Sequence, residues 1–245
     1  MLDLGAIDHF SRHHLKGSFI KIPTIQGIIR LIRTAFKKDP YWFLKQVSGV
    51  IHVGANVGQE RDLYRQHGLR VVSIEPIPEV FVTLQVNIQG YPHQAAFEYL
   101  VTDQDDAEYA FHISNNGGAS SSILELQLHK DIWPEVHYDK TITLRSVTLP
   151  SLLKRERINA SNYDALIMDT QGSESLVLKG AVPILGLFRF IKTEVPDFES
   201  YTGCCQLDDI RAFLKQHGFQ EISRHKFAEH ADSGSYYDVV FERKV

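Results

Sequence analysis

The stretch that decides the fold is Val50-Ile51-His52-Val53-Gly54-Ala55-Asn56-Val57-Gly58-Gln59, which is followed by Val71-Val72-Ser73-Ile74-Glu75-Pro76. An apolar, β-branched run ends in a loop of small residues, a helical segment extends to about residue 67, and a second apolar run ends in a carboxylate. This order predicts a nucleotide-binding β-loop-α-β unit. Gly54 and Gly58 are expected to let the backbone pass close to a ligand. The spacing of roughly 20 residues between the loop and Glu75 suits a carboxylate that binds a ribose.

The loop differs from the dinucleotide fingerprint G-x-G-x-x-G, whose third glycine allows close packing over a pyrophosphate. Here the pattern is Gly54-x-Asn56-x-Gly58, and Gln59-Glu60 lead into the helix. An acidic residue at the start of the helix disfavours a pyrophosphate. S-adenosylmethionine carries no phosphate, and its amino acid, sulfonium and ribose suit a Gly/Asn loop together with Glu75. A glycine-rich turn in an ordinary βαβ unit is the alternative.

Composition sets further bounds. A chain of 245 residues fits one domain of the larger α/β kind. The formal net charge of -4 gives no general electrostatic reason to bind nucleic acid. Cys204 and Cys205 are adjacent, so they offer no disulfide framework and indicate a reducing compartment. The sequence lacks an apolar run of the roughly 18 residues that a membrane span needs, as well as a signal-peptide pattern. Cytoplasmic residence is therefore predicted.

The first 46 residues differ from the rest and are predicted to form an N-terminal helical extension. Ile25, Ile28, Ile29, Ile32 and Phe36 fall on one helical face, and basic residues lie mostly elsewhere. The stretch 24–38 is thus a candidate for peripheral contact with an anionic membrane. Packing against the chain's own domain, or against a partner subunit, is the alternative.

Strand and helix patterns alternate after residue 50. Strands are expected near 50–53, 71–75, 95–102, 107–113, 141–147, 164–168, 188–194, 219–223 and 236–242, and helices near 57–68, 78–89, 173–185 and 206–217. The alternation predicts a doubly wound α/β domain whose mostly parallel sheet is covered on both faces. Residues 103–147 are expected to form a β-hairpin with a polar tip at 115–122. A second, antiparallel hairpin is expected at the sheet edge near the end of the chain.

Ligands of an open α/β sheet bind beyond the carboxyl ends of its strands. The residues expected there are Gly54 to Gly58, Glu75-Pro76, Thr102-Asp103, Asp169-Thr170-Gln171-Gly172 and Glu194. Four carboxylates are thereby predicted to converge on one rim. A solvated rim rich in Asp and Glu is the alternative.

Asp169 and Glu174 have the best local arguments among these carboxylates. Asp169 follows an apolar strand, and a carboxylate buried at a central strand tip needs a partner. Glu174 lies in the first turn of the next helix, where the helix dipole favours an anion. Stabilisation of that helix is an equally good interpretation of Glu174.

The motifs, taken together and in order, resemble a known family. They are Val-Gly-Ala-Asn-Val-Gly-Gln from residue 53, Ile-Glu-Pro from 74, Gly-Gly-Ala-Ser-Ser-Ser-Ile from 117, Met-Asp-Thr-Gln-Gly-Ser-Glu from 168 and Thr-Glu-Val from 193. The chain resembles the FkbM-type S-adenosylmethionine-dependent methyltransferases over about residues 48–223. The resemblance implies a class I, Rossmann-like methyltransferase domain at 47–245, with seven strands of which the last is antiparallel. It also implies O-methylation of a hydroxyl on a sugar, glycan, glycolipid or other small molecule.

Site residues follow from the same resemblance. Gly54, Asn56 and Gly58 would line the methionine end of the cofactor, Glu75 would bind the ribose, and Asp103 would lie near the adenine. His52, Ala55, Pro76, Thr102 and Asp169 complete the predicted cofactor set. His52 stands where the family usually has Asp, and Pro150 stands where it has another Asp. Pro150 suits the first turn of a helix.

The expected reaction is in-line attack of an acceptor hydroxyl on the sulfonium methyl group, helped by holding the hydroxyl in place. A base is desirable, and Asp169 is the first choice, with Glu194 the second. The predicted acceptor contacts are Ser120, Ser121, Gln171 and Glu174, and the segment 115–122 is a candidate lid. The sequence has no dedicated aspartate pair for a metal, so none is predicted.

Two other classes of function compete with this prediction. An NAD-dependent oxidoreductase would want the third glycine and a residue for hydride transfer. A non-catalytic binding or scaffold protein on a degenerate methyltransferase fold is suggested by His52. No motif in the sequence identifies the acceptor or the oligomeric state.

Overall fold

The computed structural model describes residues 39–244. The helices are η1 (Trp42–Gln46), α2 (Arg61–Gln66), α3 (Pro78–Asn87), α4 (His129–Ile132), α5 (Leu149–Arg155), η2 (Ala160–Asn162), α6 (Glu174–Ala181), η3 (Val182–Leu187) and α7 (Leu207–Gln216). The strands are β1 (Gly49–Val53), β2 (Arg70–Ile74), β3 (Gln94–Phe97), β4 (Leu100–Val101), β5 (Glu108–Ser114), β6 (Tyr138–Val147), β7 (Ala165–Met168), β8 (Phe190–Pro196), β9 (Phe219–His230) and β10 (Gly234–Arg243).

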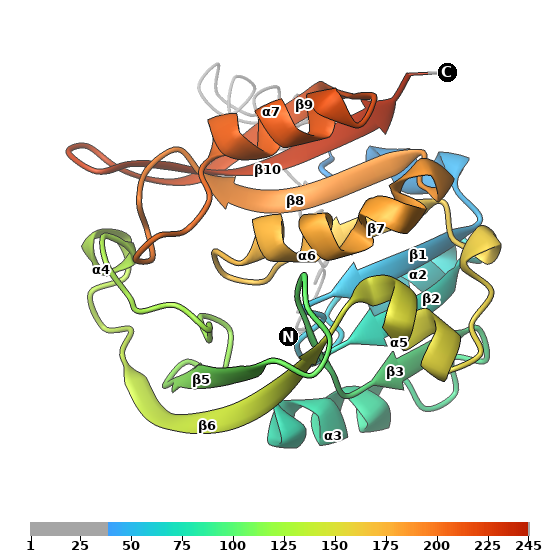
Figure 1. The fold of residues 1–245 in the computed structure, drawn as a ribbon, viewed down its shortest axis with the longest axis horizontal. Helices are drawn as coiled ribbons and strands as arrows, with labels where there is room; N and C mark the ends of the chain where they lie inside the picture. Colours follow the sequence, from blue (N-terminus) through green and yellow to red (C-terminus); the bar gives the residue numbers. More distant parts are fainter. Residues whose placement is uncertain (1–38, 245) are drawn as a thin grey trace, which may run out of the picture. The chain divides into compact units, whose positions relative to one another are not determined.

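The main sheet has seven strands in the order β3-β2-β1-β7-β8-β10-β9. β1 is an interior strand that pairs in parallel with β2 and β7, while β10 runs antiparallel to β8 (Figure 1). The predicted doubly wound, seven-stranded sheet with its last strand antiparallel is confirmed. The order also reverses beside β1, so the carboxyl ends of β1 and β7 lie at the switch point where such sheets bind ligands.

Helices cover both faces of this sheet. The larger hydrophobic cluster joins α5, α6 and α7 to one face, through residues such as Leu152, Val177 and Ile210. The other face packs against η1 and α2, through Phe43 and Tyr64. Every residue of β1 is buried, as expected for a parallel strand covered on both sides.

The strand expected at 95–102 is two strands in two sheets. β3 pairs with β2 as far as Phe97, opposite Ile74, the last residue of β2. Leu100 and Val101 then pair with β6 in a separate three-stranded sheet of order β4-β6-β5. The sequence of residues 95–102 does not reveal that β2, the partner of β3, ends at Ile74. Beyond this point β3 has no partner in β2, and the chain pairs with β6 in the other sheet.

β5 and β6 form the expected antiparallel hairpin, but residues 115–122 are not its tip. Ser122 turns back to pair with His112 on β5. The connection then continues through α4 before Tyr138 begins β6. The polar segment 115–122 is therefore folded against the end of β5.

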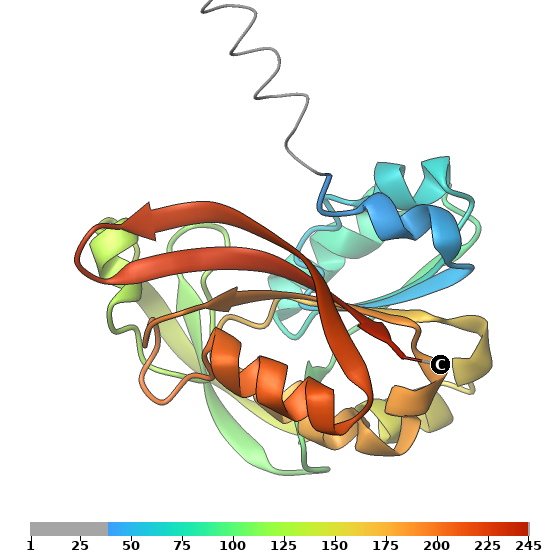
Figure 2. The ribbon, with the colours of Figure 1, turned by 90° about the horizontal axis from the view of Figure 1, so that it is seen from above.

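The C-terminal hairpin is longer than the sequence suggests. β9 was expected near 219–223 and extends to His230, because β10 pairs with it almost throughout. The hairpin extends past β8 toward α4 (Figure 2), and the Ser233 hydroxyl donates a hydrogen bond to Asp131 of α4. This overhang places part of β9 beside the carboxyl end of the sheet.

Helix α5 was not predicted, and it begins at Leu149-Pro150. Thr148 caps it by accepting a hydrogen bond from the Ser151 amide. Pro150 lies in the first turn, where its missing N–H costs nothing. The departure at residue 150 thus leaves the helix intact.

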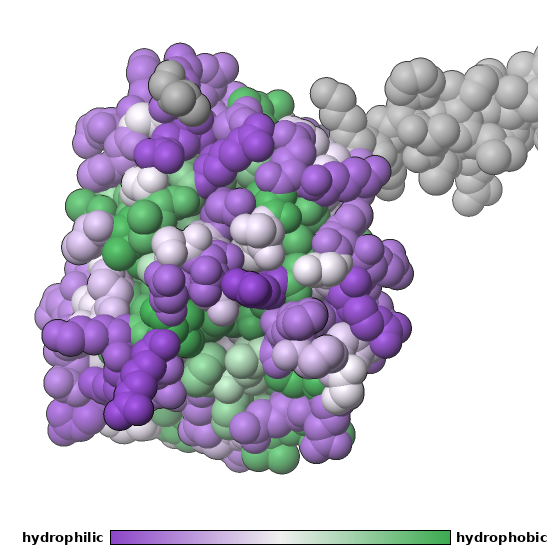
Figure 3. All heavy atoms as spheres, turned by 90° about the vertical axis from the view of Figure 1, so that its right-hand side faces the viewer, coloured by the Kyte–Doolittle hydropathy of each residue, from purple (hydrophilic) through white to green (hydrophobic). Residues whose placement is uncertain are grey.

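The predicted extension at 1–46 lies largely outside the described residues, as does the candidate membrane-contact stretch 24–38. Within residues 39–244, no helix has both the length and the apolar character to cross a membrane. At the end of the domain where the parallel strands begin, hydrophilic and hydrophobic side chains are interspersed over the surface (Figure 3). The domain boundary near residue 46 stays a prediction.

Candidate active site

Two neighbouring cavities open at the carboxyl ends of β1, β2 and β7, each with about 640 Å³ of empty space. The first cavity lies between the loop after β1, residues 75–77, residues 99–101, Phe111, residues 118–121 and the turn at 169–173. The second cavity lies between the same loop, Tyr41, the ends of β7, β8 and β10, and Phe227. Gly54, Asn56, Gln59 and Asp169 line both cavities. Asp169 therefore stands at their junction.

Gly54 is required by the backbone itself. Its φ is +80°, and a Cβ there would lie 1.8 Å from the carbonyl oxygen of Asp169. The amides of Gly54 and Ala55 both donate to the carbonyl of Ile74. The sequence-based interpretation, that this glycine makes room for a ligand, is therefore incomplete: its close neighbour is β7.

Gly58 also serves packing. A Cβ at this position, where φ is +74°, would lie 2.7 Å from Cδ1 of Leu84 on α3. Gly58 lines neither cavity. The residue lets the loop lie close to α3, and its role as a cofactor contact stays a prediction.

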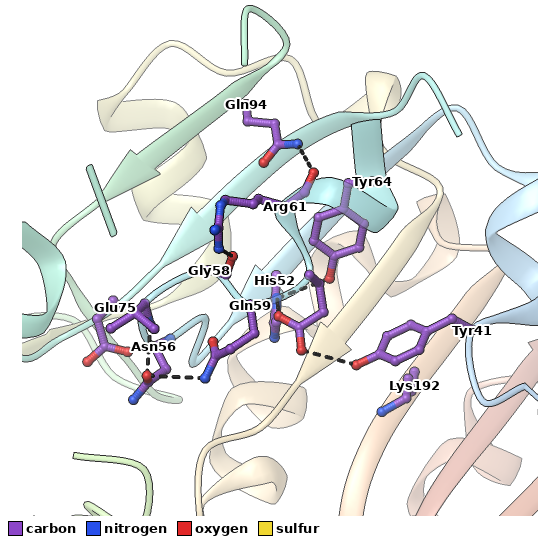
Figure 4. Close-up of polar contacts among 12 residues, drawn as sticks. Tyr41, His52, Asn56, Gly58, Gln59, Arg61, Tyr64, Glu75, Gln94 and Lys192 are labelled. Atoms are coloured by element: carbon purple, nitrogen blue, oxygen red, sulfur yellow. Dashed lines mark hydrogen bonds and ion pairs between the residues drawn. The ribbon is translucent and has the colours of Figure 1, made fainter. Parts of the chain in front are cut away.

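Glu75 is held at the tip of β2 by two backbone amides. Asn56, which lies beside Glu75 in Figure 4, donates its N–H to Oε2 at 3.0 Å. Ile77 N–H donates to Oε1 at 3.0 Å. Asn56 presents its amide from the left-handed region, with φ at 44°. Glu75 is only 4% exposed, and burial raises its pKa to about 7 against the lowering effect of the two amides. Each oxygen keeps acceptor capacity for a donor in the first cavity.

One wall of the first cavity is apolar. Ile77, Leu100 and Phe111 form a hydrophobic cluster of their own, and all three line the cavity together with Tyr99. A wall of this kind suits the flat face of a purine ring. The cavity therefore combines an apolar slot with a carboxylate at hydrogen-bonding reach of a ribose.

Thr102 and Asp103 lie away from both cavities. Thr102 is fully buried, and its carbonyl packs against Gly180 of α6, where a Cβ would come within 2.2 Å. Residues 99–101 line the first cavity instead, because the chain changes sheets after Phe97. Thr102 as a cofactor contact and Asp103 near the adenine stay predictions.

Gln171 is the hydrogen-bond partner of Asp169. Its Nε2 donates to Asp169 Oδ1 at 2.6 Å, and the Tyr201 hydroxyl donates to Gln171 Oε1 at 2.7 Å. The Gln171 backbone has φ at 52°, and its carbonyl accepts the Ser122 hydroxyl at 2.7 Å. Burial raises the pKa of Asp169, and the charge of Glu174 adds to this, while the Gln171 hydrogen bond opposes it. Asp169 is thus an oriented carboxylate that gains a proton more readily than an ordinary aspartate.

Glu174 stabilises the turn after β7. It is 1% exposed and accepts hydrogen bonds from Thr170 N (2.9 Å), Thr170 Oγ1 (3.1 Å) and Gly172 N (3.1 Å). It lines neither cavity, and its role as an acceptor contact stays a prediction. Its hydrogen bonds favour the interpretation that it stabilises the start of α6.

The two predicted serines differ. Ser121 lines the first cavity, whereas Ser120 points into a buried network away from it. The Ser120 hydroxyl lies 3.1 Å from His129 Nε2 and accepts a hydrogen bond from Asn116. His129 Nδ1 in turn lies 2.7 Å from the Tyr236 hydroxyl. This network fastens the 115–122 segment to α4 and β10.

The second cavity is polar. Lys192 forms a buried ion pair with Asp238, and its ammonium lies 4.8 Å from the centre of the Tyr41 ring. Burial raises the pKa of Glu194, and the charges of Asp169 and Asp238 raise it further. Figure 4 shows Tyr41 and Lys192 on the opposite side of the loop from Glu75, with His52 between them.

His52 lines this second cavity and is 5% exposed. Its Nδ1 lies 3.1 Å from the Tyr64 hydroxyl, and burial lowers its pKa. A neutral imidazole therefore replaces the acidic residue expected from the family resemblance.

Comparison with known proteins identifies the family. The model of the methyltransferase FkbM domain matches residues 52–221. The chain belongs to the FkbM methyltransferase family. It is an S-adenosylmethionine-dependent methyltransferase, and the alternative of an NAD-dependent oxidoreductase is set aside. The 2-O-methyltransferase NoeI of Sinorhizobium fredii is 27% identical over 173 residues, which cover 67% of this chain and 70% of NoeI.

Solved structures of other methyltransferases are similar in fold. The magnesium protoporphyrin IX methyltransferase ChlM of Synechocystis PCC 6803, with bound SAH, has a TM-score of 0.48 and 10% identity, over 96% of this chain and 90% of ChlM. TrmK of M. capricolum, in complex with S-adenosyl-homocysteine, also has a TM-score of 0.48, with 7% identity over 84% of this chain and 67% of TrmK.

The FkbM methyltransferase brings most of its predicted site residues together. Among those predicted, the residues that line the first cavity are Gly54, Asn56, Glu75, Pro76, Ser121, Asp169 and Gln171. The second cavity receives His52, Ala55 and Glu194. Within residues 39–244, no three His, Cys, Asp or Glu side chains gather as a metal site would require.

The second cavity also contains residues that were not predicted from the sequence. Lys192 and Asp238 carried a readable signal, because each is a charged residue inside an apolar strand that faces other elements. Tyr41 and Phe227 carried no such signal. They come from segments far apart in the chain and meet the site only through the fold.

Proposed function

We propose that this FkbM methyltransferase transfers the methyl group of S-adenosylmethionine to a hydroxyl of a sugar unit in a glycan, glycolipid or other small molecule. The observation that carries the proposal is the position of Asp169 at the junction of a cavity with an apolar wall and a polar cavity. The similarity to a 2-O-methyltransferase supports transfer to oxygen.

The residues of the first cavity fit the nucleoside part of the cofactor. Glu75 would accept hydrogen bonds from the ribose hydroxyls, and the wall of Ile77, Leu100 and Phe111 would cover the adenine. The loop at Gly54 and Asn56 would hold the methionine end beside Asp169. When bound, S-adenosylmethionine supplies an electrophilic methyl group on a sulfonium.

Asp169 would act as the base. Gln171 fixes its carboxylate, and a raised pKa makes that carboxylate a better proton acceptor at neutral pH than an ordinary aspartate. Asp169 would take up the proton of the acceptor hydroxyl, and the bound cofactor would supply the methyl group to the hydroxyl oxygen. Glu194, on the neighbouring strand and lining only the second cavity, is the second candidate.

A titration and a transfer assay test the proposal. Calorimetry with S-adenosylmethionine, S-adenosylhomocysteine and NAD should show binding of the first two ligands only. Radioactive methyl transfer to a panel of sugars should then detect product for wild type and for Glu98→Gln, which changes an exposed carboxylate outside both cavities. Cofactor binding without transfer to any hydroxyl would favour the non-catalytic alternative.

Cytoplasmic residence is part of the proposal. It is supported by Cys204 and Cys205, which are both buried and both free.

A further inference from the structure

We infer that the second cavity is the acceptor subsite and that it selects an uncharged sugar ring, with Phe227 of β9 as the platform on which the ring stacks. The inference rests on the proposed function and deepens it. It concerns which acceptors the enzyme accepts and which residues make the choice.

Position is the first argument. The second cavity shares Gly54, Asn56 and Asp169 with the first, so a group bound there reaches the methyl donor without crossing a wall of protein. It has about 640 Å³ of empty space, counting the part that is open to solvent, which is within the range of small-ligand sites.

Charge is the second argument. Four carboxylates line the cavity, from Glu60, Asp169, Glu194 and Asp238, and the one cationic side chain of the lining is Lys192. Lys192 is 5% exposed and already paired with Asp238. Within residues 39–244, the cavity therefore offers no free cation to the phosphate or carboxylate of an acceptor, and its acidic side chains outnumber its one basic side chain, so binding a charged acceptor there would be costly. Hydroxyl groups can instead donate hydrogen bonds to those carboxylates.

His52 supplies a further polar contact. Its side chain is buried, and its Nδ1 forms a hydrogen bond with the Tyr64 hydroxyl. Its Nε2 has no hydrogen-bond partner among residues 39–244, although the ring lines the cavity. This ring nitrogen is therefore available to form a hydrogen bond with an acceptor hydroxyl.

Phe227 is the third argument. It is 40% exposed although it is a large apolar side chain, and it lines the polar cavity from the overhanging β9–β10 hairpin. Its ring is supported from behind by Tyr236, at 5.9 Å between centroids. An exposed aromatic ring beside convergent polar groups suits a ligand that has one apolar face and polar edges, and the C–H face of a sugar ring with its hydroxyl rim is such a ligand.

The test measures binding of sugars to the protein saturated with S-adenosylhomocysteine, and saturation-transfer NMR detects the binding. The probes are neutral methyl hexopyranosides and the matching methyl hexuronides, each at millimolar concentration. We expect at least one neutral pyranoside to bind and its uronide partner to bind about tenfold more weakly or worse. Absence of binding by every neutral pyranoside, or equal binding of the charged partners, overturns the inference.

Variants assign the selection to residues. Phe227→Ala should weaken binding of the neutral pyranoside about three- to tenfold, the range for loss of an aromatic contact, and Phe227→Trp should restore it. Leu187→Ala, another exposed apolar residue, lies outside both cavities and is the matched control. Glu60→Gln should reduce the difference in affinity between the neutral pyranoside and its uronide partner. If Phe227→Ala binds like wild type, the platform is wrong.

Failure of this inference is distinguishable from failure of the proposed function. Loss of S-adenosylhomocysteine affinity in Glu60→Gln or Phe227→Ala, with pyranoside binding unchanged, would make the second cavity part of the cofactor site and overturn the inference. No S-adenosylhomocysteine binding by the wild type would instead overturn the proposed function.

Discussion

Gln171 donates a hydrogen bond of 2.6 Å from its side-chain amide to Oδ1 of Asp169. The other end of the same amide accepts the Tyr201 hydroxyl at 2.7 Å, which fixes the amide so that its NH₂ group faces the carboxylate. The orientation of Asp169 thus depends on a residue from the loop after β8. Such second partners commonly set the geometry of a reactive group.

Tyr201→Phe tests this dependence. Without the hydroxyl, the Gln171 amide can turn its oxygen toward Asp169. An amide oxygen there disfavours the ionised form of Asp169, which the charge of Glu174 already disfavours. We expect turnover to fall about two- to tenfold, the usual effect of one hydrogen bond, and the pH–rate profile to move to higher pH. Tyr91→Phe, whose hydroxyl contacts Asp62 at the surface, is the control. A lower rate with an unmoved pH profile would mean that Tyr201 only supports the fold.

Glu75 should couple cofactor binding to pH. Its pKa is raised to about 7 in the free protein, and the ionised form accepts hydrogen bonds from a ribose better than the protonated form. Affinity for S-adenosylhomocysteine, measured by calorimetry, should therefore increase as pH rises through about 7. Glu75→Ala should weaken binding by about 1.5 to 3 kcal/mol. If the dissociation constant changes neither with pH nor on Glu75→Ala substitution, Glu75 does not belong to the cofactor site.

Asp169→Asn should stabilise the free protein at alkaline pH. The pKa of Asp169 is raised in the folded state, so folding is favoured while the group is protonated, and this contribution is lost as pH rises above the unfolded value near 4 and through the raised folded value. Asn keeps the shape and accepts the Gln171 hydrogen bond without the charge. We expect a melting temperature a few degrees above wild type at pH 8, and a smaller difference at pH 5. A lower melting temperature at both pH values would indicate a structural role for the carboxylate.

Gly54→Ala should impair folding before it affects ligand binding. The new Cβ would lie 1.8 Å from the Asp169 carbonyl, and the residue has positive φ. Gly203→Ala has a similar φ of +72° with open space around it and should cost only about 1 kcal/mol. Circular dichroism melts compare the two variants. A well-folded Gly54→Ala protein that fails only to bind cofactor would restore the ligand-clearance interpretation.

Much of the fold was predictable from the sequence, because local patterns report buried parallel strands directly. The runs ending at Val53, Ile74 and Met168 are mostly apolar, and each forms an interior strand with its loop at the ligand-binding edge. The motifs at Glu75 and Asp169 were located for the same reason. Both side chains line the first cavity.

The remainder depends on contacts that local patterns do not encode. Thr102 and Asp103 line neither cavity, because the chain leaves the main sheet after Phe97 and pairs with β6. Glu174 lies in the first turn of α6, as expected, and its carboxylate accepts hydrogen bonds from Thr170 and Gly172 of the same turn. Tyr201 and Phe227 come from distant segments, so only the folded chain reveals them.

The central claim is that Asp169 removes the acceptor proton at the junction of the two cavities. The most direct measurement compares single-turnover methyl transfer by wild type and Asp169→Asn, both saturated with S-adenosylmethionine, on a sugar acceptor that the wild type methylates. We predict a rate about 10²- to 10⁴-fold lower for Asp169→Asn, with unchanged affinity for S-adenosylhomocysteine and loss of the pH inflection seen in wild type. A wild-type rate in Asp169→Asn would contradict the claim; the base would then be Glu194 if Glu194→Gln is inactive, and catalysis would rest on proximity alone if both variants remain active.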